Sequence, residues 1–348
     1  MREAVFAIPG DLATPTGGYK YDRRVIEELE KLGWKVRALA LPGDFPAPSA
    51  TSLKKTEALL AATAEATPVF FDGLAFGAMP AEILARLPRR YVALVHHPLA
   101  LETGLPAERA ARFRESERAA LSHAIRVVVT SAATKDLLAS DFGVPAEKIT
   151  VAEPGTEPAP RARGSKDTPR LLSVGAVSPR KGFRVLVEAL AQIAELDWTC
   201  RIAGSLDRDK DETAALRQRI AEAKLDARVI LLGALAEDDL QAEYDRATLF
   251  VLPSHFEGYG MAFAEALAHG LPVVACGGSA IASTVPAAAG VFVPAGDANA
   301  LAAALRHLIS NPAEIKERAD AAWAHAKNLP RWRDTAAKIA AVLAEAAA

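Results

Sequence analysis

The sequence predicts an α/β protein built from two doubly wound, Rossmann-like domains. Short apolar runs alternate with longer helical stretches along the chain, a pattern typical of parallel sheets that helices cover on both faces. A segment rich in proline, glycine and charge, residues 154–165, interrupts this pattern near the middle. The 348 residues suffice for two domains with separate cores.

Twelve short apolar runs are the predicted strands. Six precede the interrupting segment, at residues 4–8, 36–41, 69–72, 91–95, 127–130 and 149–152. Six follow it, at residues 170–175, 198–203, 229–232, 249–252, 273–275 and 291–293. We therefore expect domains over residues 1–160 and 161–330, followed by an alanine-rich helix at 331–348 with no strand after it.

Composition and charge exclude several classes of protein. The 41 basic and 43 acidic residues give no bulk charge that would attract nucleic acid. The N-terminal segment contains an acid and too short an apolar run for a signal peptide, and no run of eighteen apolar residues occurs. We expect a cytoplasmic protein in which Cys200 and Cys276 are reduced thiols.

The most informative stretch is residues 254–274, which predicts a strand end, a glycine-bearing turn, a short helix and a second strand. Gly258 and Gly260 let the backbone approach a ligand, and the N-terminus of the following helix favours an anion such as phosphate. Glu257 in the turn and Glu265 on the helix would accept hydrogen bonds from sugar or ribose hydroxyls. This stretch indicates a nucleotide-sugar site, which Tyr259 and Met261 would also line.

Residues 257–274 resemble the Glu-x7-Glu signature of the GT-B retaining glycosyltransferases of family 4, including the Gly270-Leu-Pro-Val-Val exit. The resemblance implies a GT-B fold, in which two Rossmann-like domains face a central cleft. It implies that the N-terminal domain binds the acceptor, that the C-terminal domain binds the nucleotide-sugar donor, and that the last helix crosses back to the first domain. It also implies transfer with retention.

A second motif, residues 172–183, ends the first strand of the second domain and resembles the family's Val-Gly-Arg-x4-Lys-Gly element. Lys181 matches the lysine, but Ala176 stands where many relatives carry arginine, so Arg180 is the candidate replacement. Adjacent cations at a helix start suit the neutralisation of a leaving diphosphate. Ser178 in the same loop is a further candidate.

Two elements of the first domain are candidates for the reaction. Gly17 and Gly18 lie in the first loop, before a helix expected to begin near Tyr21, and could place backbone donors on a phosphate or sugar oxygen. His96 and His97 follow the strand at 91–95, where an imidazole can donate to a sugar hydroxyl or move a proton. His96 matches the family's histidine beside the donor sugar best.

The sequence predicts no metal and no bound cofactor. Asp207, Asp209 and Asp211 superficially offer an Asp-x-Asp metal motif, but they stand at a helix start, where acids favour the helix dipole. Phe263 occupies the third position of a possible Gly-x-Gly-x-x-Gly, which argues against a dinucleotide cofactor.

These observations predict a metal-independent, retaining glycosyltransferase that moves a sugar from a UDP- or GDP-sugar to a hydroxyl of a sugar or lipid acceptor. His96, Glu257 and Lys181 are the expected catalytic residues. The alternatives are a nucleotide-sugar-binding protein without turnover and a sugar phosphorylase or epimerase of similar architecture.

A weak peripheral contact with the inner face of the membrane is a further expectation. Seven arginines of the first domain could supply a basic surface, although nearby glutamates interrupt it. They are Arg86, Arg89, Arg90, Arg109, Arg112, Arg114 and Arg118.

Overall fold

The computed structural model describes residues 2–165 and 167–348. Met1, at the start of the first predicted domain, and Lys166, within the second, lie outside the described residues. The chain divides into two compact units: unit 1 runs to Gly155 and includes Pro330–Ala348, and unit 2 is Thr156–Leu329. The division falls close to the predicted boundary at residue 160, and the C-terminal helix is part of unit 1.

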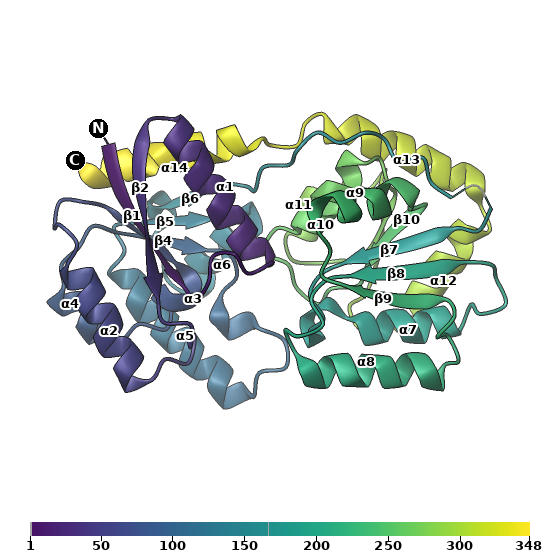
Figure 1. The fold of residues 1–348 in the computed structure, drawn as a ribbon, viewed down its shortest axis with the longest axis horizontal. Coiled ribbons are helices and arrows are strands. Elements are labelled where there is room, and N and C mark those ends of the chain that lie inside the picture. Colours follow the sequence, from purple (N-terminus) through teal and green to yellow (C-terminus); the bar gives the residue numbers. More distant parts are fainter. Residues whose placement is uncertain (1, 166) are drawn as a thin grey trace. The chain divides into compact units, whose positions relative to one another are not determined.

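Unit 1 contains a six-stranded parallel sheet in the order β2-β1-β3-β4-β5-β6 (Figure 1). Its strands are β1 (Arg2–Pro9), β2 (Trp34–Leu41), β3 (Val69–Asp72), β4 (Tyr91–Val95), β5 (Arg126–Val129) and β6 (Ile149–Val151). Its helices are α1 (Gly17–Lys31), α2 (Ala50–Ala61), α3 (Gly73–Phe76), α4 (Ala81–Arg86), η1 (Leu99–Leu101), α5 (Ala107–Ser122), α6 (Ala132–Asp141), η2 (Ala146–Lys148) and α14 (Trp332–Ala347).

Unit 2 contains a second six-stranded parallel sheet, ordered β12-β11-β10-β7-β8-β9. Its strands are β7 (Arg170–Val174), β8 (Thr199–Ala203), β9 (Val229–Gly233), β10 (Leu249–Leu252), β11 (Val273–Cys276) and β12 (Gly290–Val293). Its helices are η3 (Pro179–Lys181), α7 (Phe183–Ala191), α8 (Lys210–Glu222), α9 (Glu237–Arg246), α10 (Met261–Ala268), α11 (Ile281–Thr284), α12 (Ala298–Ile309) and α13 (Pro312–Ala326). Helices α7 and α8 cover one face of β7–β9, and α9 and α10 lie on the other side (Figure 1).

The predicted pair of doubly wound parallel sheets is confirmed. Each of the twelve predicted strands is present, with ends displaced by two residues at most. The short runs were recognisable because central strands are buried on both faces, as in β3, β4 and β10, where every residue is buried.

The predicted start of the first helix near Tyr21 was wrong. Helix α1 begins at Gly17, because the Thr16 hydroxyl accepts a hydrogen bond from the Tyr19 amide at 3.3 Å and caps the helix there. The glycine pair therefore forms the first helical turn instead of a preceding loop.

The strand orders place one topological switch point in each sheet. In unit 1 the order reverses between β1 and β3, and in unit 2 it reverses between β7 and β10. Ligands of open α/β sheets bind beyond the carboxyl ends of the strands at such points. In unit 1, the segment after β1 carries Gly17 and Gly18. In unit 2, the segment after β7 carries Lys181 and the segment after β10 carries Glu257.

Each sheet has its own hydrophobic core, containing residues such as Phe71 and Tyr91 in unit 1 and Trp198 and Phe250 in unit 2. Cys200 and Cys276 are free, buried thiols. Among the described helices, none combines the length and the apolar character needed to span a membrane.

Candidate functional site

Two loops of unit 2 meet at the carboxyl ends of β7 and β10. Gly182, which follows η3, has φ 67°, and a Cβ there would lie 2.2 Å from the Pro253 carbonyl oxygen. Only glycine permits this backbone contact. The His255 amide donates to the Arg180 carbonyl at 2.8 Å and joins the same loops.

This contact brings Lys181 and Arg180 onto Glu257. Lys181 Nζ lies 2.6 Å from Glu257 Oε1, and Arg180 Nη1 lies 3.3 Å from Glu257 Oε2 and donates to the Phe256 carbonyl at 2.9 Å. Burial alone would raise the pKa of Glu257, but the charges of Lys181 and then Arg180 lower it to about 2. The carboxylate is therefore ionised and shared by two cations.

Arg180, the candidate replacement for the arginine missing at Ala176, turns toward Glu257. Its side chain is 22% exposed, and that of Lys181 is 13% exposed. Gly175 provides space for the lysine, since a Cβ there would lie 3.0 Å from Lys181 Cε. Ser178 lies directly before η3, and its carbonyl accepts from the Lys181 amide at 3.1 Å.

Gly260, directly before α10, adopts the left-handed conformation, with φ 91°. A Cβ at this residue would lie 2.7 Å from the Phe263 ring, so glycine is required. The first amides of an α-helix have no intrahelical partners, and here the helix follows the turn that carries Glu257, Gly258 and Tyr259. This arrangement favours an anion beside the turn. Met261, the first helical residue, is half-buried.

Glu265 on α10 is held by a residue that sequence reasoning missed. The buried Tyr244 hydroxyl, on α9, donates to Glu265 Oε2 at 3.1 Å. The Tyr244 ring stacks on His269 with centroids 4.9 Å apart, and His269 Nε2 lies 2.7 Å from Gln241 Oε1. Nothing in the local sequence around Tyr244 indicated this contact, because it depends on how two helices pack.

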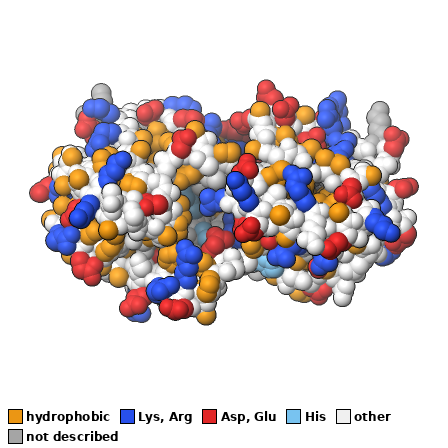
Figure 2. All heavy atoms as spheres, turned by 60° about the horizontal axis from the view of Figure 1, so that its bottom comes forward, with side chains coloured by type: hydrophobic (Ala, Val, Ile, Leu, Met, Phe, Trp, Pro, Cys, Tyr) orange, Lys and Arg blue, Asp and Glu red, His pale blue; other side chains and the backbone are white. Residues whose placement is uncertain are grey.

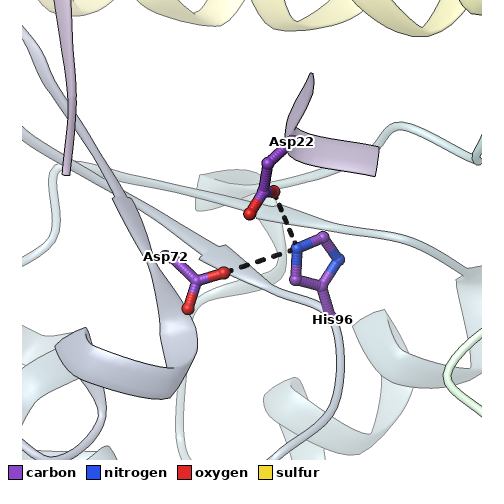
Figure 3. A group of neighbouring side chains, drawn as sticks. All are labelled: Asp22, Asp72 and His96. Carbon is purple, nitrogen blue, oxygen red and sulfur yellow. Dashed lines mark hydrogen bonds and ion pairs between the residues drawn. The ribbon is translucent and has the colours of Figure 1, made fainter. Parts of the chain in front are cut away.

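In unit 1, His96 contacts two buried carboxyl groups that were also missed. His96 Nε2 lies 3.0 Å from Asp22 Oδ1 and 3.6 Å from Asp72 Oδ2 (Figure 3). Asp72 is the last residue of β3. Its position at a strand end is a signal in the sequence of the same kind as that of His96, which follows β4. Asp22 lies on α1, where only the turn of the helix brings it to the imidazole.

Burial and charge shift the pKa values in this cluster. Burial, and then the negative charge of Asp22, raise the pKa of Asp72 to about 7. For His96, burial alone would lower the pKa, but the Asp22 carboxylate, with Asp72 behind it, raises it above its ordinary value.

The other predicted site residues of unit 1 are Gly17, Gly18 and His97. A Cβ at Gly18 would make an ordinary contact with the His96 ring, 3.6 Å from Cδ2, and Gly17 is its neighbour in the first turn of α1. His97 Nε2 lies 3.7 Å from Glu102 Oε2.

Within the described residues, one group of three side chains has ligand atoms close enough to hold a metal ion. It is Asp22, Asp72 and His96, whose atoms lie within 4.8 Å of one another. The contact between His96 Nε2 and Asp22 Oδ1, at 3.0 Å, is also an ordinary hydrogen-bond length. Asp209 instead caps α8 by accepting from the Glu212 amide at 2.9 Å.

The predicted basic surface of unit 1 is largely paired with acids. Arg86 lies 2.9 Å from Glu57, and Arg89 lies 3.4 Å from Glu65. Arg112 and Arg114 form further pairs, with Glu108 and Asp141. Acidic and basic side chains are interspersed over the visible face of each unit in Figure 2.

An open groove of about 960 Å³ in unit 2 lies apart from these residues. It is lined by α7, α8 and residues 294–299. Two of its charged side chains, Glu188 and Arg219, pair with each other. None of the predicted site residues lines it, so we do not place the chemistry there.

Two family models match the chain, and together they cover most of it. Residues 157–326 match the glycosyl transferases group 1 model, and residues 14–155 match the glycosyl transferase 4-like domain. The chain belongs to the group 1 glycosyltransferases of the GT4 type. The matches divide where the two units divide.

A similar curated protein is the amylovoran biosynthesis glycosyltransferase AmsK of Erwinia amylovora, 34% identical over 50% of this chain and 45% of that protein. The chain spans 37% to 45% of the length of the first curated relatives that it matches.

Solved structures show the same fold. Sucrose-phosphate synthase of Thermosynechococcus elongatus matches with a TM-score of 0.84 and 22% identity, covering 99% of both chains. Anabaena Alr3699/HepE in complex with UDP-glucose matches with a TM-score of 0.80 and 19% identity, covering 99% of this chain and 100% of that one.

Proposed function

We propose that this protein is a glycosyltransferase that moves a sugar from a UDP- or GDP-sugar to a hydroxyl acceptor with retention. The observation that carries the proposal is the convergence of Lys181 and Arg180 on Glu257 beside the N-terminus of α10, at the switch point of unit 2. The family membership and the UDP-glucose complex of a protein with the same fold support it.

The assigned roles follow the charges that the reaction creates. As the bond between the anomeric carbon and the diphosphate breaks, the diphosphate takes the electron pair and the sugar ring becomes cationic. Lys181, Arg180 and the first amides of α10 stabilise the anion. Glu257 accepts from hydroxyls of the donor sugar, and Glu265 accepts from the ribose.

His96 is assigned to the sugar that is transferred, and the acceptor to unit 1. The oxygen of the acceptor hydroxyl forms the new bond to the anomeric carbon on the face that the diphosphate leaves, and the hydroxyl proton passes to the departing diphosphate. The acceptor is a sugar or a lipid-linked hydroxyl. Because cationic side chains and amides can neutralise the diphosphate, we expect the reaction to need no metal.

Incubation of the protein with a panel of nucleotide sugars and a cell extract tests the proposal. We expect a glycosylated product by mass spectrometry, equimolar nucleoside diphosphate, undiminished turnover in excess chelator and a retained anomeric configuration by NMR. Binding of the nucleotide sugar without release of nucleoside diphosphate would indicate a nucleotide-sugar-binding protein without turnover. Products formed only with inorganic phosphate, or isomerised nucleotide sugar, would indicate a phosphorylase or an epimerase.

Peripheral binding to anionic membranes is a second proposal, and it concerns only the acceptor. The ion pairs of Arg86, Arg89, Arg112 and Arg114 reduce the free positive charge that such binding would use. Co-sedimentation with anionic vesicles at low salt, lost when Arg89, Arg90, Arg109 and Arg112 become serine, would support it. Absence of binding, with transfer to a soluble sugar, would exclude it.

A further inference from the structure

The carboxyl groups of Asp22 and Asp72 approach His96 from two elements of unit 1. Asp22 lies on α1, Asp72 ends β3, and His96 follows β4, at the carboxyl edge of the sheet. In Figure 3 both carboxyl groups face the same ring nitrogen, Nε2, while Nδ1 points away from both. The two acids are 0% and 3% exposed.

The hydrogen bonds of the two acids are unequal. Asp72 Oδ1 accepts from the Leu74 amide at 2.8 Å and caps α3. Asp22 Oδ1 contacts His96, but Asp22 Oδ2 is buried without a hydrogen-bond partner and lies on the side of Asp72 (Figure 3). A buried carboxylate oxygen without a donor is costly, so a proton held between the two acids would relieve it.

The surroundings restrict the imidazole to this orientation. The Tyr21 ring meets the His96 ring edge-on, with centroids 5.0 Å apart, and Gly18 lies against the Cδ2 side. An acceptor at Nε2 requires that this nitrogen carry a proton in the neutral ring. Nδ1 then carries no proton and is the nitrogen that can accept a hydrogen bond or a proton from a substrate.

We propose that Asp22 and Asp72 are positioning residues for the transfer reaction: as a carboxyl pair that shares a proton, they hold His96 Nε2–H inward and present Nδ1 to the substrate. This role rests on the proposed function. It explains why two acids are buried at the switch point of unit 1, where neither is exposed enough to serve as a surface charge.

The tautomer of His96 can be measured without any substrate. Nitrogen-15 NMR of the free wild-type protein, with His96 assigned through His96→Gln, should show protonated Nε2. Nε2 should keep its proton at a pH where the His96 ring is neutral. A neutral ring protonated at Nδ1, or a stoichiometric divalent ion in the purified protein, would overturn the proposal.

Kinetics then test the consequence for transfer. Asp22→Asn should lower kcat by about 10- to 1000-fold, because an amide can donate to Nε2 and favours the opposite tautomer. The dissociation constant of the nucleoside diphosphate should change less than about threefold, since that ligand lacks the transferred sugar. Asp44→Asn, at an exposed position whose carboxylate accepts from the Ser49 amide and the Ser52 hydroxyl, should leave both values unchanged.

A double-variant comparison separates positioning from folding. In a His96→Gln background, Asp22→Asn should reduce kcat no further, because its effect passes through the imidazole. Additive losses, or an unchanged kcat in Asp22→Asn alone, would contradict the proposal. A wild-type protein that turns over no nucleotide sugar would instead refute the proposed function, while the NMR result would still test the orientation of His96.

Discussion

Replacing Glu257 with glutamine should tighten the binding of free UDP or GDP while slowing sugar transfer. The Glu257 carboxylate is held by Lys181 at 2.6 Å and by Arg180 at 3.3 Å. A diphosphate must share these cations with the carboxylate. Glutamine keeps the size of the side chain but removes the competing charge, whereas transfer needs the carboxylate as the acceptor of donor-sugar hydroxyls.

The pKa of Glu257 sets the size of the effect. A decrease to about 2 from an ordinary value of about 4.3 corresponds to roughly 3 kcal/mol in favour of the ionised form. Part of that attraction remains when the diphosphate is bound, so we expect a gain of about 1 to 2 kcal/mol, a roughly 5- to 30-fold lower dissociation constant.

Calorimetric titration of wild type and Glu257→Gln with UDP and with GDP measures this difference. Glu314→Gln is the matched control, because Glu314 pairs with Arg318 at 2.8 Å on α13 of the same unit. Unchanged or weaker binding in Glu257→Gln, with folding intact, would refute the assignment of Lys181 and Arg180 to the diphosphate.

Three further outcomes follow from the structure. Lys181→Ala should lower kcat more than it raises KM in steady-state assays, since charge on the leaving phosphate grows toward the transition state, and Lys316→Ala, on exposed α13, should match wild type. Glu265→Ala should weaken donor binding by about 1 to 3 kcal/mol in calorimetry, because ribose hydroxyls lose a charged acceptor. Burial raises the pKa of Glu117 to about 7, although the hydrogen bonds from the amides of Leu99 and Ala100 act to lower it. Its contribution to stability is complete below about pH 4.3 and is lost as the pH rises through about 7. Between about pH 4.3 and 7, the free energy of unfolding of Glu117→Gln should therefore fall less steeply with pH than that of wild type, by up to about 1.4 kcal/mol per pH unit. Equal kcat and KM effects, unchanged donor affinity and an unchanged slope would contradict these three expectations in turn.

The sheets could be predicted from the sequence because their signal is local. A run such as Val69–Asp72 is short, apolar and buried on both faces, so it is recognisable without its neighbours. The start of α1 was not predicted correctly, because the glycine pair was expected to belong to a loop. The Thr16 cap instead places both glycines in the first helical turn.

The candidate site was predictable where backbone conformation required particular residues. Gly182 and Gly260 adopt positive φ, and they mark the loops that carry Lys181 and Glu257. The partners Tyr244 and Asp22 were missed, because each reaches its glutamate or histidine through helix packing that no spacing in the chain encodes.

A crystal structure of the protein with bound UDP-sugar or GDP-sugar tests the central claim most directly. We predict that the diphosphate lies against Lys181, Arg180 and the first amides of α10, with the ribose hydroxyls on Glu265 and the sugar hydroxyls on Glu257. A nucleotide bound elsewhere, such as in the groove between α7 and α8, would contradict the assignment of the donor site to the switch point of unit 2.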